Sequence, residues 1–127
     1  MKELAISLVI IASIFIGNNI TQNYTQSSVQ ETSNDLFLLK EDIKSNNNKE
    51  DLQNKVNDIY DNWHHKHQRL AYYIEHDELE KVETNLTLLK SYIEMEEETE
   101  SVAKVEETVY ILRHIEAKNK FNLENIF

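Results

Sequence analysis

Two matched apolar stripes between Asp51 and Ile93 constrain the fold of this chain most strongly. On each side of a short break at His76-Asp77, an apolar residue recurs every three or four positions. The first stripe contains Leu52, Val56, Ile59, Trp63, Leu70 and Tyr73, with His67 inside it, and the second contains Leu79, Val82, Leu86, Leu89 and Ile93. This spacing places each stripe on one side of an α-helix. We therefore expect two long helices that bury their stripes against each other as an antiparallel hairpin.

The remainder of the chain is expected to add further helices to this hairpin. Its 127 residues include no proline and one glycine, so turns that need special backbone angles are scarcely accessible. One stripe precedes the hairpin and another follows it: Val29, Leu36, Leu39 and Ile43, then Val102, Val105, Val109, Leu112 and Ile115. The predicted fold is all-α, an antiparallel helical bundle built on the long-helix hairpin and preceded by a short N-terminal hydrophobic helix.

The N-terminal segment is too apolar to be an ordinary surface helix. Thirteen uncharged and mostly apolar residues run from Leu4 to Ile16. Their helix rises about 20 Å, short of a roughly 30 Å hydrocarbon core, which favours a signal peptide. Counted on to Ile20, seventeen residues suffice for a thin bilayer, and the residues around Gly17 serve poorly as a cleavage site. We therefore expect an uncleaved anchor over a removed signal in residues 1–20, and an extracytoplasmic helical bundle in residues 21–127.

The orientation of this segment follows from the basic residues. Lys2 precedes it, and no other Lys or Arg occurs before Lys40. This predicts a single-pass protein of the cell membrane with its C-terminal domain outside. Residues 22–34 are rich in Ser, Thr, Gln and Asn, which is typical of a juxtamembrane spacer. They are also compatible with a helix start, because Ser28 and Glu31 have the spacing of a capping box.

Capping patterns predict where the helices of the hairpin begin. Asn47 with Glu50 has the spacing of an N-cap and its partner, so we expect the second helix to begin there and to end near Ile74. Asp77 with Glu80 repeats this spacing and predicts the start of the third helix.

The end of the chain is expected to complete the bundle. Acidic residues from Glu94 to Glu100 should end the third helix and lead, through a loop that contains Ser101, into a fourth. The apolar residues of the C-terminal segment are Phe121, Leu123, Ile126 and Phe127. They are too large to be left in water, so we expect this segment to fold over the open end of the bundle.

Four stretches carry a resemblance to a known family. They are Trp63 in the long helix, the junction His76-Asp77-Glu78-Leu79-Glu80, the helix from Asn85-Leu86 to Tyr92-Ile93, and the ending Phe121 to Phe127. In these the chain resembles an uncharacterised family of Gram-positive spore-forming bacteria, catalogued as domain of unknown function 4363. The resemblance covers nearly the whole chain and implies a short hydrophobic segment, a helical extracytoplasmic domain and a membrane protein as partner. It assigns no catalytic or binding residue, because the family has no established activity.

The densest cluster of candidate ligands is His64, His65 and His67. On a helix His64 and His67 lie one turn apart on one face, and two such imidazoles can chelate zinc or another divalent cation. A closed site would need further ligands from a neighbouring helix. The competing interpretation is a polar helix face with one semi-buried histidine, His67, which lies inside the apolar stripe. We favour this second interpretation and expect no cofactor, with His64 and His67 kept as the metal candidates.

Composition excludes several other functions. The formal net charge is −10, whereas nucleic acid binding requires a clustered excess of Lys and Arg. The lack of cysteine excludes disulfides, thiolate metal sites and a cysteine nucleophile. No Ser, Cys or Gly-rich arrangement provides a nucleophile, a base and an oxyanion donor, so we do not expect an enzyme.

These observations favour binding over catalysis. The predicted function is a membrane-anchored extracytoplasmic helical interaction or accessory module that partners a membrane protein. The alternative is an extracytoplasmic metal- or ligand-sensing domain that uses His64, His65 and His67. Trp63 would suit a ligand platform, but its place in the apolar stripe predicts a core position.

Overall fold

Four helices account for most of the described chain. The computed structural model describes the backbone of residues 1–45 and 48–126, and the side chains of this part as far as Phe121. In chain order the helices are α1 (Lys2–Ser45), α2 (Lys49–Leu70), α3 (His76–Glu94) and α4 (Glu98–Ile126). The prediction of an all-α bundle is confirmed.

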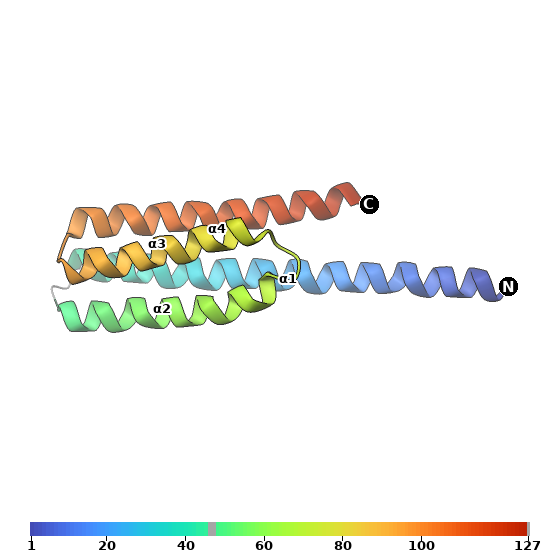
Figure 1. Ribbon diagram of the computed structural model, residues 1–127, viewed down its shortest axis with the longest axis horizontal. Coiled ribbons are helices and arrows are strands. Elements are labelled where there is room, and N and C mark those ends of the chain that lie inside the picture. The colour runs from blue at the N-terminus through green and yellow to red at the C-terminus, as the bar shows by residue number, and fades with distance from the viewer. Residues whose placement is uncertain (46–47, 127) are drawn as a thin grey trace.

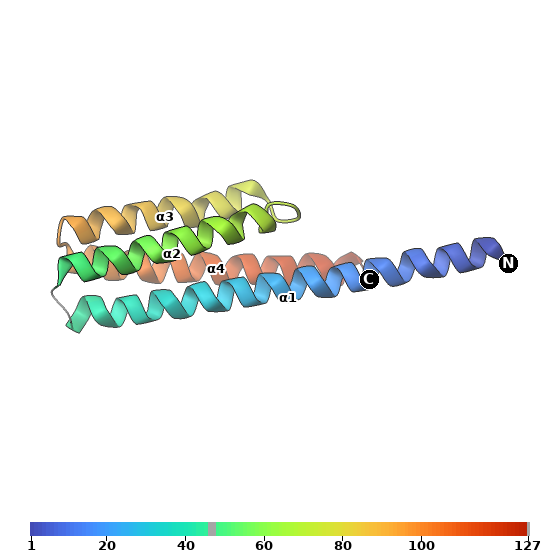
Figure 2. The same ribbon diagram turned by 90° about the horizontal axis from the view of Figure 1, so that it is seen from below.

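The helices run alternately up and down, and each packs against two others (Figure 1). α1 and α3 both contact α2 and α4, while the diagonal pairs do not contact each other in the described part of the chain. The α1–α2 and α3–α4 connections lie at one end, which we call the distal end. The α2–α3 connection lies at the other end, which we call the anchor end because α1 leaves the bundle there (Figure 2).

The predicted stripes form the core. The buried apolar residues are Val29, Leu36, Leu39 and Ile43 of α1, Leu52, Val56, Ile59, Trp63 and Leu70 of α2, Leu79, Val82, Leu86, Leu89 and Ile93 of α3, and Val105, Leu112 and Ile115 of α4. Their alternating spacing of three and four residues lets neighbouring helices interlock side chains at a small crossing angle. Of the stripe residues, Tyr73 lies partly exposed in the α2–α3 connection, and Val102 and Val109 are half-buried at the edge of the core.

Small polar residues extend the core where α1 and α4 lack apolar side chains. Thr25, Ser28 and Thr32 of α1 and Ser101 and Thr108 of α4 are buried in line with the stripes. The hydroxyls of Thr25, Ser101 and Thr108 donate to the backbone carbonyl one turn earlier at 2.8, 2.7 and 2.7 Å. Such a bond satisfies the hydroxyl within its own helix, so the side chain can be buried without a partner from a neighbouring helix.

α1 is one uninterrupted helix, so the predicted spacer over residues 22–34 is wrong. The capping-box pattern at Ser28 is not used either, because Ser28 lies inside the helix with its side chain buried. The physical reason is that Thr25, Ser28 and Thr32 continue the stripe of Val29 and Leu36 toward the N-terminus. The predicted hydrophobic helix is therefore the first part of α1.

At the distal end, hydrogen bonds close the start of α2 and the turn between α3 and α4. Asn48 caps α2, since its Oδ1 accepts a bond from a backbone N–H three residues later at 3.1 Å, whereas the predicted cap, Asn47, lies outside the described residues. Between α3 and α4, Glu96 has a φ of 57°, which allows the two backbone bonds that close a helix C-terminus. α4 begins two residues later, so the prediction of Ser101 in a loop is wrong: its side chain is buried in the first turn.

The α2–α3 connection comes earlier than predicted, because α2 ends at Leu70 rather than near Ile74. Tyr73 has left the helix, and its hydroxyl donates to the backbone carbonyl of Thr21 in α1 at 3.0 Å. This bond holds the connection against α1. α3 then begins one residue before Asp77, which lies in the first turn instead of at the N-cap.

The C-terminal segment does not fold over the bundle, and that prediction is wrong. α4 remains helical through Ile126, since its backbone hydrogen bonds continue and no glycine or proline interrupts them. Phe121 is 61% exposed. Phe127 lies outside the described residues.

A substitution of Trp63 tests whether the apolar stripe of α2 lies in the core, because the Trp63 side chain is completely buried. We expect Trp63→Ala to lower the free energy of unfolding by about 3–5 kcal/mol, from the lost apolar contact and the cavity left behind. Tyr110→Ala is the matched control: Tyr110 is 73% exposed, and its loss should cost less than about 0.5 kcal/mol. Thermal unfolding in detergent, followed by circular dichroism, measures both. Equal melting temperatures for wild type and Trp63→Ala would contradict a core role.

Candidate functional site

The apolar part of α1 lies outside the bundle. Residues 1–17 are all exposed. An 18-residue window of this helix near the N-terminus has a mean hydropathy of 2.0, and none of it is buried. In Figure 1 the segment continues the α1 axis past the ends of the other helices. By length and composition the helix is compatible with a single-pass anchor, and a signal sequence has the same features.

Negative charge is concentrated in the distal half of the bundle. Ion pairs between α1 and α2, Lys55 with Asp42 and Lys66 with Glu31, show which levels of the two helices correspond. On this register the distal half comprises residues 35–61 and 85–109, with fourteen acidic and six basic side chains. The anchor half, residues 18–34, 62–84 and 110–126, has eight acidic and six basic side chains. An anionic surface would therefore repel the distal half more strongly than the anchor half.

His64 and His67 share a face of α2 as predicted, and both face Glu83 of α3. Nδ1 of His64 forms a hydrogen bond with Oε1 of Glu83 at 3.1 Å. Nδ1 of His67 lies 2.7 Å from the same oxygen, but outside hydrogen-bond geometry, so this buried nitrogen has no hydrogen-bond partner. His67 is 8% exposed, which confirms that it is the buried histidine of the cluster. Glu83 was missed from the sequence because it lies 19 residues from His64 and no motif connects them.

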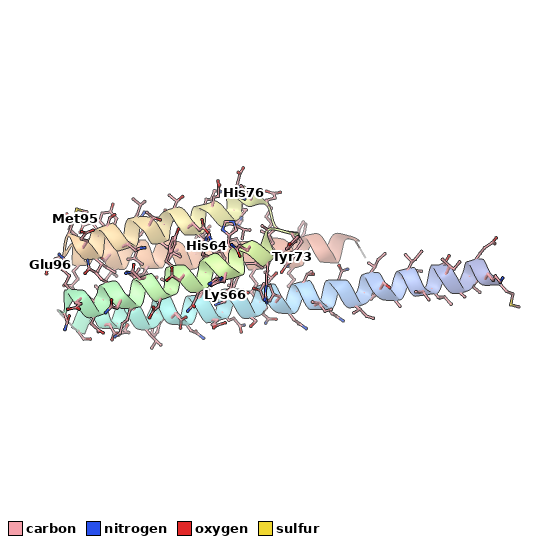
Figure 3. All side chains as sticks on the ribbon, turned by 60° about the horizontal axis from the view of Figure 1, so that its bottom comes forward. His64, Lys66, Tyr73, His76, Met95 and Glu96 are labelled. Carbon is pink, nitrogen blue, oxygen red and sulfur yellow. The ribbon has the colours of Figure 1, made fainter. Side chains whose placement is uncertain are left out.

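The other histidines are placed differently. His65 is exposed and lies in a surface depression between α1 and α2 that Glu31 and Arg69 also line. His76 approaches His67 edge-on, with ring centroids 5.8 Å apart, while its Nε2 lies 2.7 Å from Oε1 of Glu80. Figure 3 shows His64 and His76 on neighbouring helices toward the anchor end. The fold therefore brings His76 to the cluster and leaves His65 outside it.

This arrangement suits a hydrogen-bonded carboxylate better than a metal ion. Nδ1 of His64 and Nδ1 of His67 both face one oxygen of Glu83, so these two nitrogens are directed at a carboxylate. Among the side chains described, those of residues 1–45 and 48–121, no group of three or more His, Asp or Glu is arranged to hold a metal.

We accordingly predict no zinc binding tighter than about micromolar, or about 8 kcal/mol, because such affinity needs more than two preorganised ligands. Titration calorimetry of the tag-free protein measures it. Submicromolar binding that disappears when His64 and His67 are both changed to Ala, and persists in the control His65→Ala, would contradict this prediction and support a sensing role.

A second polar cluster joins three elements at the anchor end. Oγ1 of Thr25 donates to the carbonyl of Thr21, lies 2.8 Å from the hydroxyl of Tyr73, and accepts a bond from Nδ2 of Asn119 at 3.3 Å. Burial raises the pKa of the Tyr73 hydroxyl. These residues come from α1, the α2–α3 connection and α4, so no sequence motif identified them. The cluster fixes α4 against α1 where the bundle ends.

Together these features define a small four-helix bundle in which α1 continues outward as an exposed apolar segment. By length and composition, this helix could cross a membrane. A family model described as a domain of unknown function (DUF4363) matches residues 19–126, and the chain belongs to this family. The matched region contains the whole bundle, which confirms the family resemblance noted in the sequence. No curated protein and no solved structure matches the chain.

Proposed function

We propose that this protein is anchored in the cell membrane by the first part of α1, and that its bundle lies outside the cytoplasm as an accessory module for another membrane protein. The observation that carries this proposal is the continuity of α1. The segment outside the bundle and the stripe from Val29 to Ile43 in the core belong to one helix. An anchor and a domain that share a helix are mechanically coupled.

This coupling supports a membrane protein as partner. Neither glycine nor proline occurs between Ile20 and Thr25, the first buried residue, and α1 is one continuous helix there. A tilt or rotation of α1 in the membrane would therefore move the bundle as one body. A neighbouring membrane helix that contacts the apolar segment is the partner best able to use this coupling.

The proposed role is not catalytic. The hydroxyls of Thr25, Ser101 and Thr108 donate to the backbone of their own helices. His64 and His67 face a carboxylate. Neither group is arranged as a nucleophile with its base, which supports binding over chemistry.

Metal or ligand sensing by the histidine cluster is the second candidate function. It is favoured by one observation, the buried Nδ1 of His67 that has no hydrogen-bond partner. A ligand that displaced Glu83 would gain this nitrogen together with Nδ1 of His64. The zinc titration described above tests this candidate.

Topology is tested by a single cysteine, since the chain has none of its own. Met95 lies in the α3–α4 turn at the distal end and is 57% exposed (Figure 3). We expect a membrane-impermeant maleimide to label Met95→Cys in intact, wall-stripped cells. The protein should stay in the membrane pellet after a salt wash, because burial of apolar surface is not screened by salt.

Ser101→Cys is the matched control for this labelling. It lies six residues further along on the same side of the membrane, but its side chain is buried, so it should resist the reagent until the protein is denatured. Labelling of Met95→Cys only after lysis would place the bundle in the cytoplasm. Labelled protein in the medium, shortened at its N-terminus, would show a cleaved signal in place of an anchor.

The partner is tested by photo-crosslinking from the apolar segment. We expect benzoylphenylalanine at Ile10, which is exposed on α1, to form a discrete adduct with another membrane protein in native membranes. The same group at Tyr110, exposed on the bundle, should not form that adduct. Mass spectrometry identifies the product. Adducts with lipid alone at Ile10 would contradict the proposal that a membrane protein contacts this segment.

A further inference from the structure

The last turns of α4 lie beside the part of α1 where the apolar segment begins. Two contacts set the register of these antiparallel helices: Lys40 with Glu106 at 2.7 Å, and Asn119 with Thr25 at 3.3 Å. Lys40 also lowers the pKa of the Glu106 carboxyl, as expected for a close ion pair. Residues nearer the C-terminal end of α4 therefore lie beside residues nearer the N-terminus of α1.

This register brings the end of α4 level with the membrane segment. From Asn119 to Ile126, α4 advances by about 10 Å at 1.5 Å per residue. The same distance back from Thr25 in α1 reaches Asn18, within two residues of Ile20, where the predicted membrane segment ends. Figure 2 shows the C-terminal end of α4 beside α1 at the point where α1 continues alone.

α4 extends beyond the helices that cover it elsewhere. α2 has ended at Leu70, and the connection to α3 is held against α1 through Tyr73. Asn119 contacts Thr25, which Tyr73 also contacts, so the turns of α4 after Asn119 lie beyond helices α2 and α3, and the connection between those helices reaches only as far as Thr21. Phe121, in the first of these turns, is 61% exposed.

The composition of these turns is unlike that of a surface helix in water. Three of the six residues from Phe121 to Ile126 are large and apolar, and they follow two lysines; the three are Phe121, Leu123 and Ile126. Leaving such side chains in water forfeits about 1.5–3 kcal/mol for each one that could be fully buried. Basic residues followed by aromatic and aliphatic residues are typical of helices that lie at a membrane surface.

We propose that the C-terminal turns of α4 meet the interface of the membrane that α1 enters, with Phe121 as the inserted side chain, as a second attachment of the bundle. This inference rests on the proposed anchoring by α1. Lipid is the occupant because it would surround the α1 segment that lies beside these turns. The distribution of charge agrees, because this end lies in the less acidic half of the bundle; Lys120 directly precedes Phe121, while Lys118 is paired with Glu75.

A second attachment would restrict the motion of the bundle relative to the membrane. A bundle held by α1 alone can rotate about the axis of that helix. Contact between the end of α4 and the lipid surface would fix its rotation and tilt, so the same faces of α2 and α3 would always be turned toward or away from a partner.

The test uses the full chain in vesicles of phosphatidylethanolamine and phosphatidylglycerol. Phe121→Cys carries an environment-sensitive nitrobenzoxadiazole label, and Tyr110→Cys, also exposed on α4 but in the middle of the bundle, carries the same label as matched control. Because both side chains are exposed, neither change should disturb the core, and circular dichroism checks this. We expect both proteins to float with the vesicles. Only the label at position 121 should show blue-shifted emission and a loss of emission with spin-labelled lipid.

Three outcomes would overturn the proposal, and they differ in what else they affect. Flotation of both proteins with identical, water-like emission would exclude the second attachment and leave the anchor intact. Blue-shifted emission at position 121 without quenching by spin-labelled lipid would show that a protein surface covers this end. Failure to float would remove the anchoring function itself, and the inference with it.

Discussion

The burial of one side of α1 against α2 and α4 is the interaction on which the rest of the structure depends. Residues 21–34 are rich in Ser, Thr and Asn, each of which costs up to about 0.7 kcal/mol relative to Ala in a helix. Val29, Leu36, Leu39 and Ile43 each contribute about 1.5–3 kcal/mol on full burial, which offsets that cost. The helix therefore continues without a break from the bundle into the apolar segment, and the packing of α1 sets how the domain stands relative to that segment.

Polar groups inside the bundle fall into two kinds with different consequences. The hydroxyls of Ser101 and Thr108 are satisfied within their own helices and add little constraint between helices, whereas Oγ1 of Thr25 also contacts Tyr73 and Asn119 and so joins three elements. By contrast, Nε1 of Trp63 and Nδ1 of His67 are buried one turn apart on α2 without a hydrogen-bond partner, and each such group costs about 1–3 kcal/mol. Oγ1 of Thr32 and Oγ of Ser33 in α1 are also buried without a hydrogen-bond partner, so α1 as well as α2 carries unsatisfied polar groups.

Charge and apolar surface have opposite gradients along the molecule. The distal half holds most of the excess negative charge, whereas the exposed apolar segment at the start of α1 and Phe121 lie toward the other end; Phe37 and Leu38 of α1 are exposed in the distal half. Both gradients favour the same orientation at a membrane, with the acidic end directed into water. These two features are independent of each other, and both are compatible with attachment at the anchor end of the bundle.

The sequence by itself determined the helical class and nearly all of the apolar core. The stripes of α2 and α3 are local patterns, and a spacing of three and four residues buries one helix face whatever its partner. Tertiary structure decided where the polar side chains lie, because a side chain with a hydroxyl can cap a helix, face water or occupy a core position. Ser28 fits a capping box and Ser101 a loop, yet both are buried, since α1 and α4 align these residues with the stripes of their neighbours. The pairing of His64 and His67 with Glu83 likewise arises only when α3 folds back along α2, because spacing within one helix carries no information about the residue opposite.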